Sequence, residues 1–168
     1  MLPPFRLHTE RTFRETRSVH FADLSIPGTN GLDLVTHHGP AVSPPDHELL
    51  GMQWYMHHHQ TDHNRVLSGA RLFELVHYDW THQNHWYVYL TPELGALEIP
   101  TKCYHRSYSC LEGSILINQA KRDEYYDEKA EFCQTRPTYD LVHPPAYFNC
   151  TPAEVENFIL YGVLDDTK

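Results

Sequence analysis

The sequence lacks the features of a membrane-spanning, disulfide-stabilised or polyanion-binding protein. It has no run approaching the roughly 18 apolar residues needed to cross a bilayer. Lys and Arg number 13 against 22 Asp and Glu, which gives a formal net charge of −9. Because no basic block offsets this charge, binding to nucleic acid or to an anionic membrane is disfavoured. No CxxC pair occurs, so we expect reduced thiols at all four cysteines: Cys103, Cys110, Cys133 and Cys150.

The length and the first residues predict a simple organisation. The chain has 168 residues, which fits one domain with room for a core. Residues 1–6 contain no apolar segment of the kind that a secretory signal needs, so we expect a cytoplasmic protein. We divide the single domain into an N-terminal extension (1–50), which would exchange between subunits, a core (51–126) and a C-terminal helix (151–164).

Most of the sequence shows the pattern of an all-β domain. Short runs rich in β-branched and aromatic residues alternate with turn residues, as in sandwiches and barrels. Ser68-Gly69 predicts a hairpin turn, and Glu112-Gly113 predicts another break between strands. The expected strands are 18–24, 32–36, 52–59, 63–67, 70–78, 86–90, 96–99, 105–110 and 114–120.

A helix is predicted near the C-terminus. Thr151-Pro152-Ala153-Glu154 has the residues of a capping box, with Pro at the first helical position. Val155, Phe158 and Ile159 then form an apolar stripe at helical spacing. We expect this helix to pack over the β structure and give it no catalytic role.

Histidine is abundant, with 14 residues, and it is accompanied by 11 tyrosines. Histidine titrates near neutral pH and binds metal ions, so its excess points to chemistry. In a strand over Met52–His59, alternate side chains would share a face. The opposite face would be mostly apolar and would need a cover. The polar face, which we expect to line a cavity, would contain Gln53, Tyr55, His57 and His59.

Two segments resemble the motifs of the cupin superfamily. His57-x-His59, a polar position at Asp62 to Asn64 and then Gly69 resemble the first motif. Gly95 through Pro100 to His105 resembles the second. The resemblance implies an all-β cupin barrel of the RmlC-like jelly-roll type with a short C-terminal helix. It also implies a pocket built around His57, His59 and His105.

A closer resemblance is to nucleotide-sugar cupins, the dTDP-4-keto-6-deoxyhexose 3,4-ketoisomerases and the dTDP-4-dehydrorhamnose 3,5-epimerases. It is carried by the segments 90–105, 115–117 and 124–128. This resemblance implies that His57 is the catalytic base and that Tyr126 stacks on the substrate base. Where the epimerases have their tyrosine acid, this chain reads Asn118-Gln119-Ala120-Lys121, and their aspartate partner to the histidine is not visible.

One chemistry is metal-free acid–base catalysis, by an isomerase or epimerase acting on a keto sugar or a related small carbonyl compound without a cofactor. His57 would remove a proton next to the carbonyl. A neighbouring donor would stabilise the enolate oxygen or return the proton; the candidates are His59, His105, Tyr55 and Tyr126. A diphosphate would be bound by arginine, and the candidates are Arg65, Arg71 and Arg106.

A second chemistry uses a divalent transition metal, Fe, Zn, Ni or Mn. His57, His59 and His105 would be ligands, with Asp62 or His63 as the fourth. A third possibility is a non-catalytic cupin that binds a small ligand. In each case we expect a small-molecule partner and a homodimer, because the apolar face of Met52–His59 needs a cover.

Overall fold

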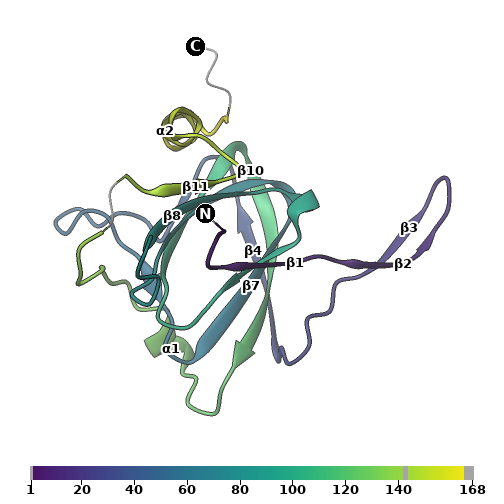
Figure 1. Ribbon diagram of the computed structural model, residues 1–168, viewed down its shortest axis with the longest axis horizontal. Helices are drawn as coiled ribbons and strands as arrows, with labels where there is room; N and C mark the ends of the chain where they lie inside the picture. Colours follow the sequence, from purple (N-terminus) through teal and green to yellow (C-terminus); the bar gives the residue numbers. More distant parts are fainter. Residues whose placement is uncertain (1, 142–143, 165–168) are drawn as a thin grey trace.

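The computed structural model describes residues 2–141 and 144–164, and its main feature is one strongly curved sheet (Figure 1). Its hydrogen-bonded order runs β1-β9-β7-β10-β4, and β5, β6, β8 and β11 attach to this path. The strands of the main sheet are β1 (Arg6–His8), β4 (Gly31–His37), β5 (Val42–Ser43), β6 (Tyr55–Met56), β7 (Gln60–Val76), β8 (His85–Leu90), β9 (Ala96–Ile99), β10 (Tyr104–Arg122) and β11 (Ala146–Phe148). The predicted mostly-β architecture is confirmed.

The long strands β7 and β10 form the antiparallel spine of this sheet, and each is paired on both sides. The first part of β7 pairs with β9 and the second part pairs with β8. The second half of β10 pairs with β4, whereas its first half pairs with β5 and β6. All the remaining strands of the main sheet therefore pair with β7 or β10, except β1, which pairs with β9, and β11, which pairs with β8.

The predicted hairpin at Ser68-Gly69 is wrong, because β7 continues through it. Gly69 has φ +75°, and the pairing with β10 shifts register on either side of it. A Cβ at Gly69 would overlap the backbone oxygen of Gly113, so only glycine fits this irregularity. The break predicted at Glu112-Gly113 is likewise an irregularity within β10.

The irregularity changes which side chains of β7 face inward. Before it, Asp62 and Asn64 line the interior cavity; after it, Arg71 and Phe73 do. Without a shift, strand alternation would place even- and odd-numbered residues on opposite faces. The Gly69 irregularity thus brings Arg71 to the same side as Asp62.

The apolar core has an inner part and an outer part. The inner cluster joins residues of β7, β8, β9 and β10, with Leu75, Val88 and Leu97 fully buried. An outer cluster lies under α2 (Pro152–Tyr161), where Val155 and Phe158 pack on β7 and β10. The capping box predicted for α2 is confirmed, with Thr151 and Glu154 bonding each other's backbone N–H.

The other helical segments are short. A 3-10 turn η1 spans Pro92–Leu94, and α1 spans only Glu128–Glu131. α1 has no counterpart among the elements predicted from the sequence. Among the described residues, no helix is long and apolar enough to cross a membrane.

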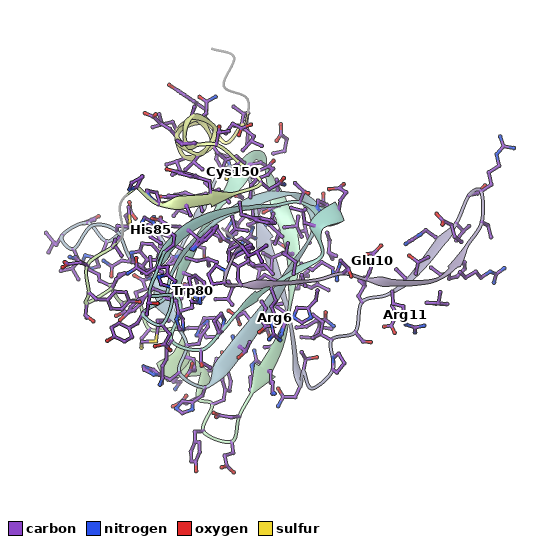
Figure 2. All side chains as sticks on the ribbon, in the orientation of Figure 1. Arg6, Glu10, Arg11, Trp80, His85 and Cys150 are labelled. Carbon is purple, nitrogen blue, oxygen red and sulfur yellow. The ribbon has the colours of Figure 1, made fainter. Side chains whose placement is uncertain are left out.

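Residues of the N-terminal fifty contribute to the main sheet and also form an arm. β1, β4 and β5 belong to the sheet, whereas β2 (Arg11–Glu15) and β3 (His20–Asp23) pair only with each other. This two-stranded arm projects away from the body (Figure 1). Glu10 and Arg11 lie where the arm leaves the sheet (Figure 2).

The strand predicted over Met52–His59 is mostly wrong, since only Tyr55–Met56 is strand. Trp54 is buried with Val76 and Tyr104, and Tyr139 and Leu141 pack against this cluster. A backbone bridge between Trp54 and Thr135 attaches the segment 135–141, which contains Tyr139 and Leu141, to this region. Trp54 and part of Met56 are thus covered by the same chain, whereas Met52 is 47% exposed. A second subunit is not needed to cover Trp54.

Candidate active site

A cavity of about 200 Å³ opens into the concave interior of the sheet. Both polar and apolar side chains line it, from β4, β5, β6, β7 and β10 and from the segments around His57 and Phe132. The lining residues are Asp33, Val35, Ser43, Tyr55, His57, Asp62, Asn64, Arg71, Phe73, His105, Ser107, Leu116, Asn118 and Phe132.

His57 lies just after β6 and is almost fully buried. Its Nδ1 is 2.9 Å from the backbone oxygen of Glu131. A carbonyl oxygen only accepts, so Nδ1 carries the hydrogen and Nε2 is the basic nitrogen of the neutral ring. That Nε2 is 3.5 Å from Oδ2 of Asp62. The geometry leaves Nε2 free to take a proton beside a carboxylate.

Glu131 shapes the backbone after His57. Its buried carboxylate oxygen Oε2 accepts hydrogen bonds from the backbone N–H groups of His58 (2.8 Å) and His59 (3.2 Å). The chain therefore bends around this carboxylate instead of continuing as a strand. As a result, His59 points away from the cavity and bonds Asp123 through Nδ1 at 3.0 Å.

Asp62 is the buried carboxylate of the site. Its Oδ1 accepts from Nε2 of Gln60 (2.6 Å) and from Nδ2 of Asn118 (2.8 Å). Its Oδ2 faces the Nε2 atoms of His57 (3.5 Å) and His105 (3.6 Å). Burial alone would raise the pKa of Asp62, but the two imidazoles and Asn118 outweigh it and lower that pKa to about 2. Asp62 is therefore an anion at neutral pH.

His105, near the start of β10, is the second imidazole of the cluster. Its Nδ1 donates to the backbone oxygen of Cys103 at 3.0 Å, and its ring centroid is 5.0 Å from that of His57. Burial, reinforced by the charge of His57, lowers the pKa of His105 to about 4. Burial also opposes protonation of His57, but its bonds and attraction to Asp62 and Glu131 prevail and its pKa is raised. One imidazole thus gains a proton readily, and its neighbour stays neutral.

The same three residues form a set that can bind a metal ion. One donor atom from each of His57, Asp62 and His105 lies within 4.8 Å of the others, and all three residues are buried. Two imidazoles and one carboxylate suit Zn, Fe, Mn or Ni and leave coordination positions for other ligands.

Arg71 supplies a positive charge to the cavity. It is 2% exposed, and its guanidinium bonds Oγ of Ser114 (2.6 Å), Oγ of Ser107 (3.3 Å) and the backbone oxygen of Val35 (3.4 Å). Burial lowers the pKa of Arg71 to about 10, so it stays protonated at neutral pH. Because these three partners are uncharged, the cation can attract an anionic group in the cavity.

Aromatic residues lie at the exposed side of the cavity. Tyr55 lies parallel to His57 at a centroid distance of 6.4 Å. Phe132, which is 43% exposed, contacts both rings edge-on, 5.8 Å from Tyr55 and 5.1 Å from His57. These flat surfaces can stack against a ring-shaped ligand.

The structure brings together four of the residues predicted for the site: Tyr55, His57, Arg71 and His105. His59 and Tyr126 do not line the cavity. The prediction for His59 fails because Glu131 bends the backbone, as described above. Tyr126 packs instead under Arg122, whose guanidinium carbon lies 4.5 Å from the ring centroid.

Arg65, Arg106 and His63 were also predicted as site residues, and strand alternation places them on the opposite face of the sheet. Arg65 bonds the backbone oxygen of His8. Arg106 bonds Asp46 at 2.8 Å. His63 faces Glu98 and cannot complete a metal site with His57.

Some residues of the cavity were missed as site residues by the sequence analysis. Asp62 was considered only as a metal ligand, although it is the carboxylate partner of His57. Its presence on the inner face, with Asn64, follows from alternation along β7 and was predictable. The contributions of Asn118, Glu131 and Phe132 depend on contacts between distant segments and had no local signal.

No protein-family model and no curated protein sequence matches this chain. Solved structures do match it, and they define the class of fold. QdtA, a sugar 3,4-ketoisomerase from Thermoanaerobacterium thermosaccharolyticum in complex with TDP, superposes with a TM-score of 0.58 at 16% identity. The match covers 82% of this chain and 91% of that chain. The chain thus shares its fold with this sugar ketoisomerase.

Two further matches represent related activities. A dTDP sugar isomerase from Desulfovibrio desulfuricans has a TM-score of 0.58 at 12% identity, covering 82% of this chain and 85% of that one. A dTDP-4-dehydrorhamnose 3,5-epimerase from Bacillus anthracis, with TDP and PPi bound, has a TM-score of 0.57 at 13% identity, covering 85% and 89%. The resemblance to RmlC-like cupins inferred from the sequence is confirmed at the level of the fold.

Proposed function

We propose that this protein is an isomerase or epimerase that moves a proton next to the carbonyl of a nucleotide-linked keto sugar, within a jelly-roll cupin barrel. The observation that carries the proposal is the arrangement of His57, Asp62 and Arg71 around one cavity. It combines a base, an anion that stabilises its protonated form, and a fixed cation. Likeness to sugar ketoisomerases and epimerases supports the same chemistry at the level of the fold.

The reaction follows from the roles of these groups. Nε2 of His57 removes the proton from the carbon next to the carbonyl, and the electron pair of that C–H bond moves to form an enolate. Asp62 stabilises the resulting imidazolium, and Arg71 stabilises the enolate oxygen. In an isomerisation, His57 returns the proton to the former carbonyl carbon, and the proton of the adjacent hydroxyl moves to the enolate oxygen, so that carbonyl and hydroxyl exchange places. In an epimerisation, a water molecule on the opposite face protonates the carbon, and His57 releases its proton to solvent. No cofactor is consumed, because the proton removed is replaced.

The size of the cavity indicates how the substrate lies. About 200 Å³ is smaller than the roughly 300–1,000 Å³ of sites that enclose a drug-sized ligand. The sugar ring would occupy the cavity, and the nucleotide would lie outside it, past Tyr55 and Phe132. The diphosphate then interacts with groups near the opening, and Arg71 remains available for the carbonyl oxygen.

Proton exchange with heavy water tests this function. The protein is incubated with TDP-4-keto-6-deoxyglucose, the sugar nucleotide bound by a mutant of QdtA in one of its solved structures, and deuterium uptake is followed by mass spectrometry. Exchange is expected for the unaltered protein, and His57→Asn should lower its rate by at least about 10²-fold. His59→Asn, which alters a neighbouring histidine outside the cavity, serves as the matched control and should exchange normally. Equal rates for the two variants would remove His57 from the base role.

A second candidate function is a metal-dependent cupin enzyme, favoured by the closeness of the donor atoms of His57, Asp62 and His105. A bound divalent ion would polarise a substrate carbonyl. Elemental analysis of the purified protein tests this candidate. Near-stoichiometric metal that is lost in His105→Asn but kept in His59→Ala would favour it over metal-free catalysis.

A further inference from the structure

A second cluster of metal-binding residues lies on the opposite face of the sheet. His8 on β1, Glu98 on β9 and His63 on β7 come from three neighbouring strands. His63 is directly opposite Glu98 in the register, and His8 is opposite Ala96, two residues before Glu98. Since alternate residues share a face, all three side chains lie on the side away from the interior cavity.

The donor atoms are close enough for one ion. Nε2 of His8 is 2.6 Å and Nε2 of His63 is 3.9 Å from the same oxygen of Glu98, Oε2. All three donor atoms lie within 4.8 Å of one another, and the two rings meet edge-on at 5.1 Å. Tetrahedral ligands at the usual zinc distances are about 3.4 Å apart, so small side-chain rotations bring these atoms to an ion.

A hydrogen bond from His63 to the backbone leaves the ring nitrogen that faces Glu98 able to bind a metal ion. Its Nδ1 is 2.8 Å from the backbone oxygen of Gln119 and must donate to it. The lone pair of the neutral ring is therefore on Nε2, the atom that faces Glu98. A hydrogen bond from the other ring nitrogen to a carbonyl is the usual way in which a metal-binding histidine is oriented.

The cluster is partly open to solvent, as in a metal site that keeps a free coordination position. The side chain of His63 is only 7% exposed, whereas those of Glu98 and His8 are 24% and 32% exposed. An ion can thus enter from solvent, bind three protein ligands and keep water at a further position.

We propose that His8, Glu98 and His63 bind a divalent transition-metal ion, with Zn²⁺ as the best match to two imidazoles and one carboxylate. The site is independent of the proposed function, because none of its residues lines the interior cavity. The ion connects β1 to β9 and β7. It thereby fastens the segment from which the arm departs, where Arg65 also lies 3.5 Å from Glu10.

Calorimetric titration of the metal-free protein with zinc chloride tests the proposal, with four chains compared. The unaltered protein should bind a Zn²⁺ ion that is lost, or bound at least tenfold more weakly, in His63→Ala and in Glu98→Gln. His59→Ala is the matched control, since it removes a partly exposed histidine that also pairs with a carboxylate, and it should bind as the unaltered protein does. Unchanged Zn²⁺ stoichiometry and affinity in both His63→Ala and Glu98→Gln would overturn the proposal.

His57, Asp62 and His105 in the interior cavity could also bind Zn²⁺. A second measurement distinguishes binding there from binding at His8, Glu98 and His63. Zn²⁺ should raise the thermal unfolding temperature of the unaltered protein and of His57→Asn, because both retain the link between β1 and the sheet. Glu98→Gln, which preserves side-chain size, should show no such rise even when its circular dichroism spectrum is native. A rise that disappears only in His57→Asn would assign the ion to the interior cavity and overturn the proposal.

Discussion

At the scale of single residues, the site depends on the different pKa values of two imidazoles that lie beside the same carboxylate. Asp62 lies 3.5 Å from His57 and 3.6 Å from His105, yet the pKa of the first is raised and that of the second is lowered. Both rings are buried, and burial lowers both pKa values. For His57, the hydrogen bond and attraction to Asp62, followed by the contacts with Glu131, outweigh burial; His105 has no such hydrogen bond to Asp62 and faces the charge of His57. Two similar side chains thereby acquire different protonation states.

Asp62→Asn should lower the pKa of His57, because the neutral amide no longer stabilises the imidazolium. The variant should also exchange the substrate proton about 10²-fold more slowly, since a weaker base removes it. Titration of the histidine ring by nuclear magnetic resonance measures the pKa directly. A His57 pKa that is unchanged or higher in the variant would contradict the proposed pairing.

His105 should make the folded protein less stable in mild acid. Its pKa is lowered from 6.5 to about 4 on folding, so the unfolded chain binds more protons between these values. The contribution of neutral His105 to the free energy of unfolding is therefore fully present above pH 6.5. It is lost as the pH drops towards 4, and the loss is about 3 kcal/mol for a shift of this size. Urea unfolding at several pH values should give a flatter profile for His105→Asn than for the unaltered protein. Parallel profiles would exclude His105 as the source of this acid sensitivity.

The residues of the site were predictable to different degrees. His57, His105, Tyr55 and Arg71 lie in or beside motifs with a local pattern, and all four line the cavity. The error at His59 has a long-range cause, because its backbone N–H bonds the side chain of Glu131, 72 residues further along the chain. A pattern of alternation cannot reveal such a contact.

At the scale of elements, the site depends on an irregularity rather than on regular strands. Gly69 interrupts the pairing of β7 with β10 and turns Arg71 to the side that already contains Asp62. The sequence predicted a turn at this glycine, as its φ of +75° would allow, but not that the strand continues. Strand positions such as 96–99 and the helix at 152–161 were predictable because their signals are local.

Gly69→Ala should destabilise the protein by well over about 1 kcal/mol and reduce proton exchange, because the added Cβ overlaps Gly113 and disturbs the register. Gly28→Ala is the matched control. Gly28 also has positive φ, but a Cβ there meets nothing within 4 Å. Urea unfolding and the exchange assay compare the two variants. Equal loss of stability in both would show that backbone strain alone, and not the contact with Gly113, accounts for the effect.

At the scale of the whole molecule, the curved sheet separates two chemical environments. The concave side encloses the candidate active site, and the other side contains the cluster of His8, Glu98 and His63 as well as apolar residues open to solvent. On the edge strand β4, Leu32 is 70% exposed and Leu34 is 69% exposed. Exposed apolar side chains grouped on an edge strand are typical of an association surface.

We expect a homodimer that covers this part of β4. Leu34→Lys should yield a monomer, since a charge placed in an apolar interface opposes its burial. Sedimentation velocity at micromolar concentration measures the state of association, and Leu160→Lys, which alters an exposed leucine on α2, is the control. A monomeric unaltered protein under these conditions would refute the expected dimer.

The crystal structure of the His57→Asn variant with TDP-4-keto-6-deoxyglucose would show directly whether the cavity binds the sugar beside position 57. We expect the sugar ring inside the cavity, with the carbon next to the carbonyl about 3–3.5 Å from the side chain at position 57 and the carbonyl oxygen towards Arg71. A sugar bound on another face, or inside the cavity with its carbonyl turned away from Arg71, would contradict it.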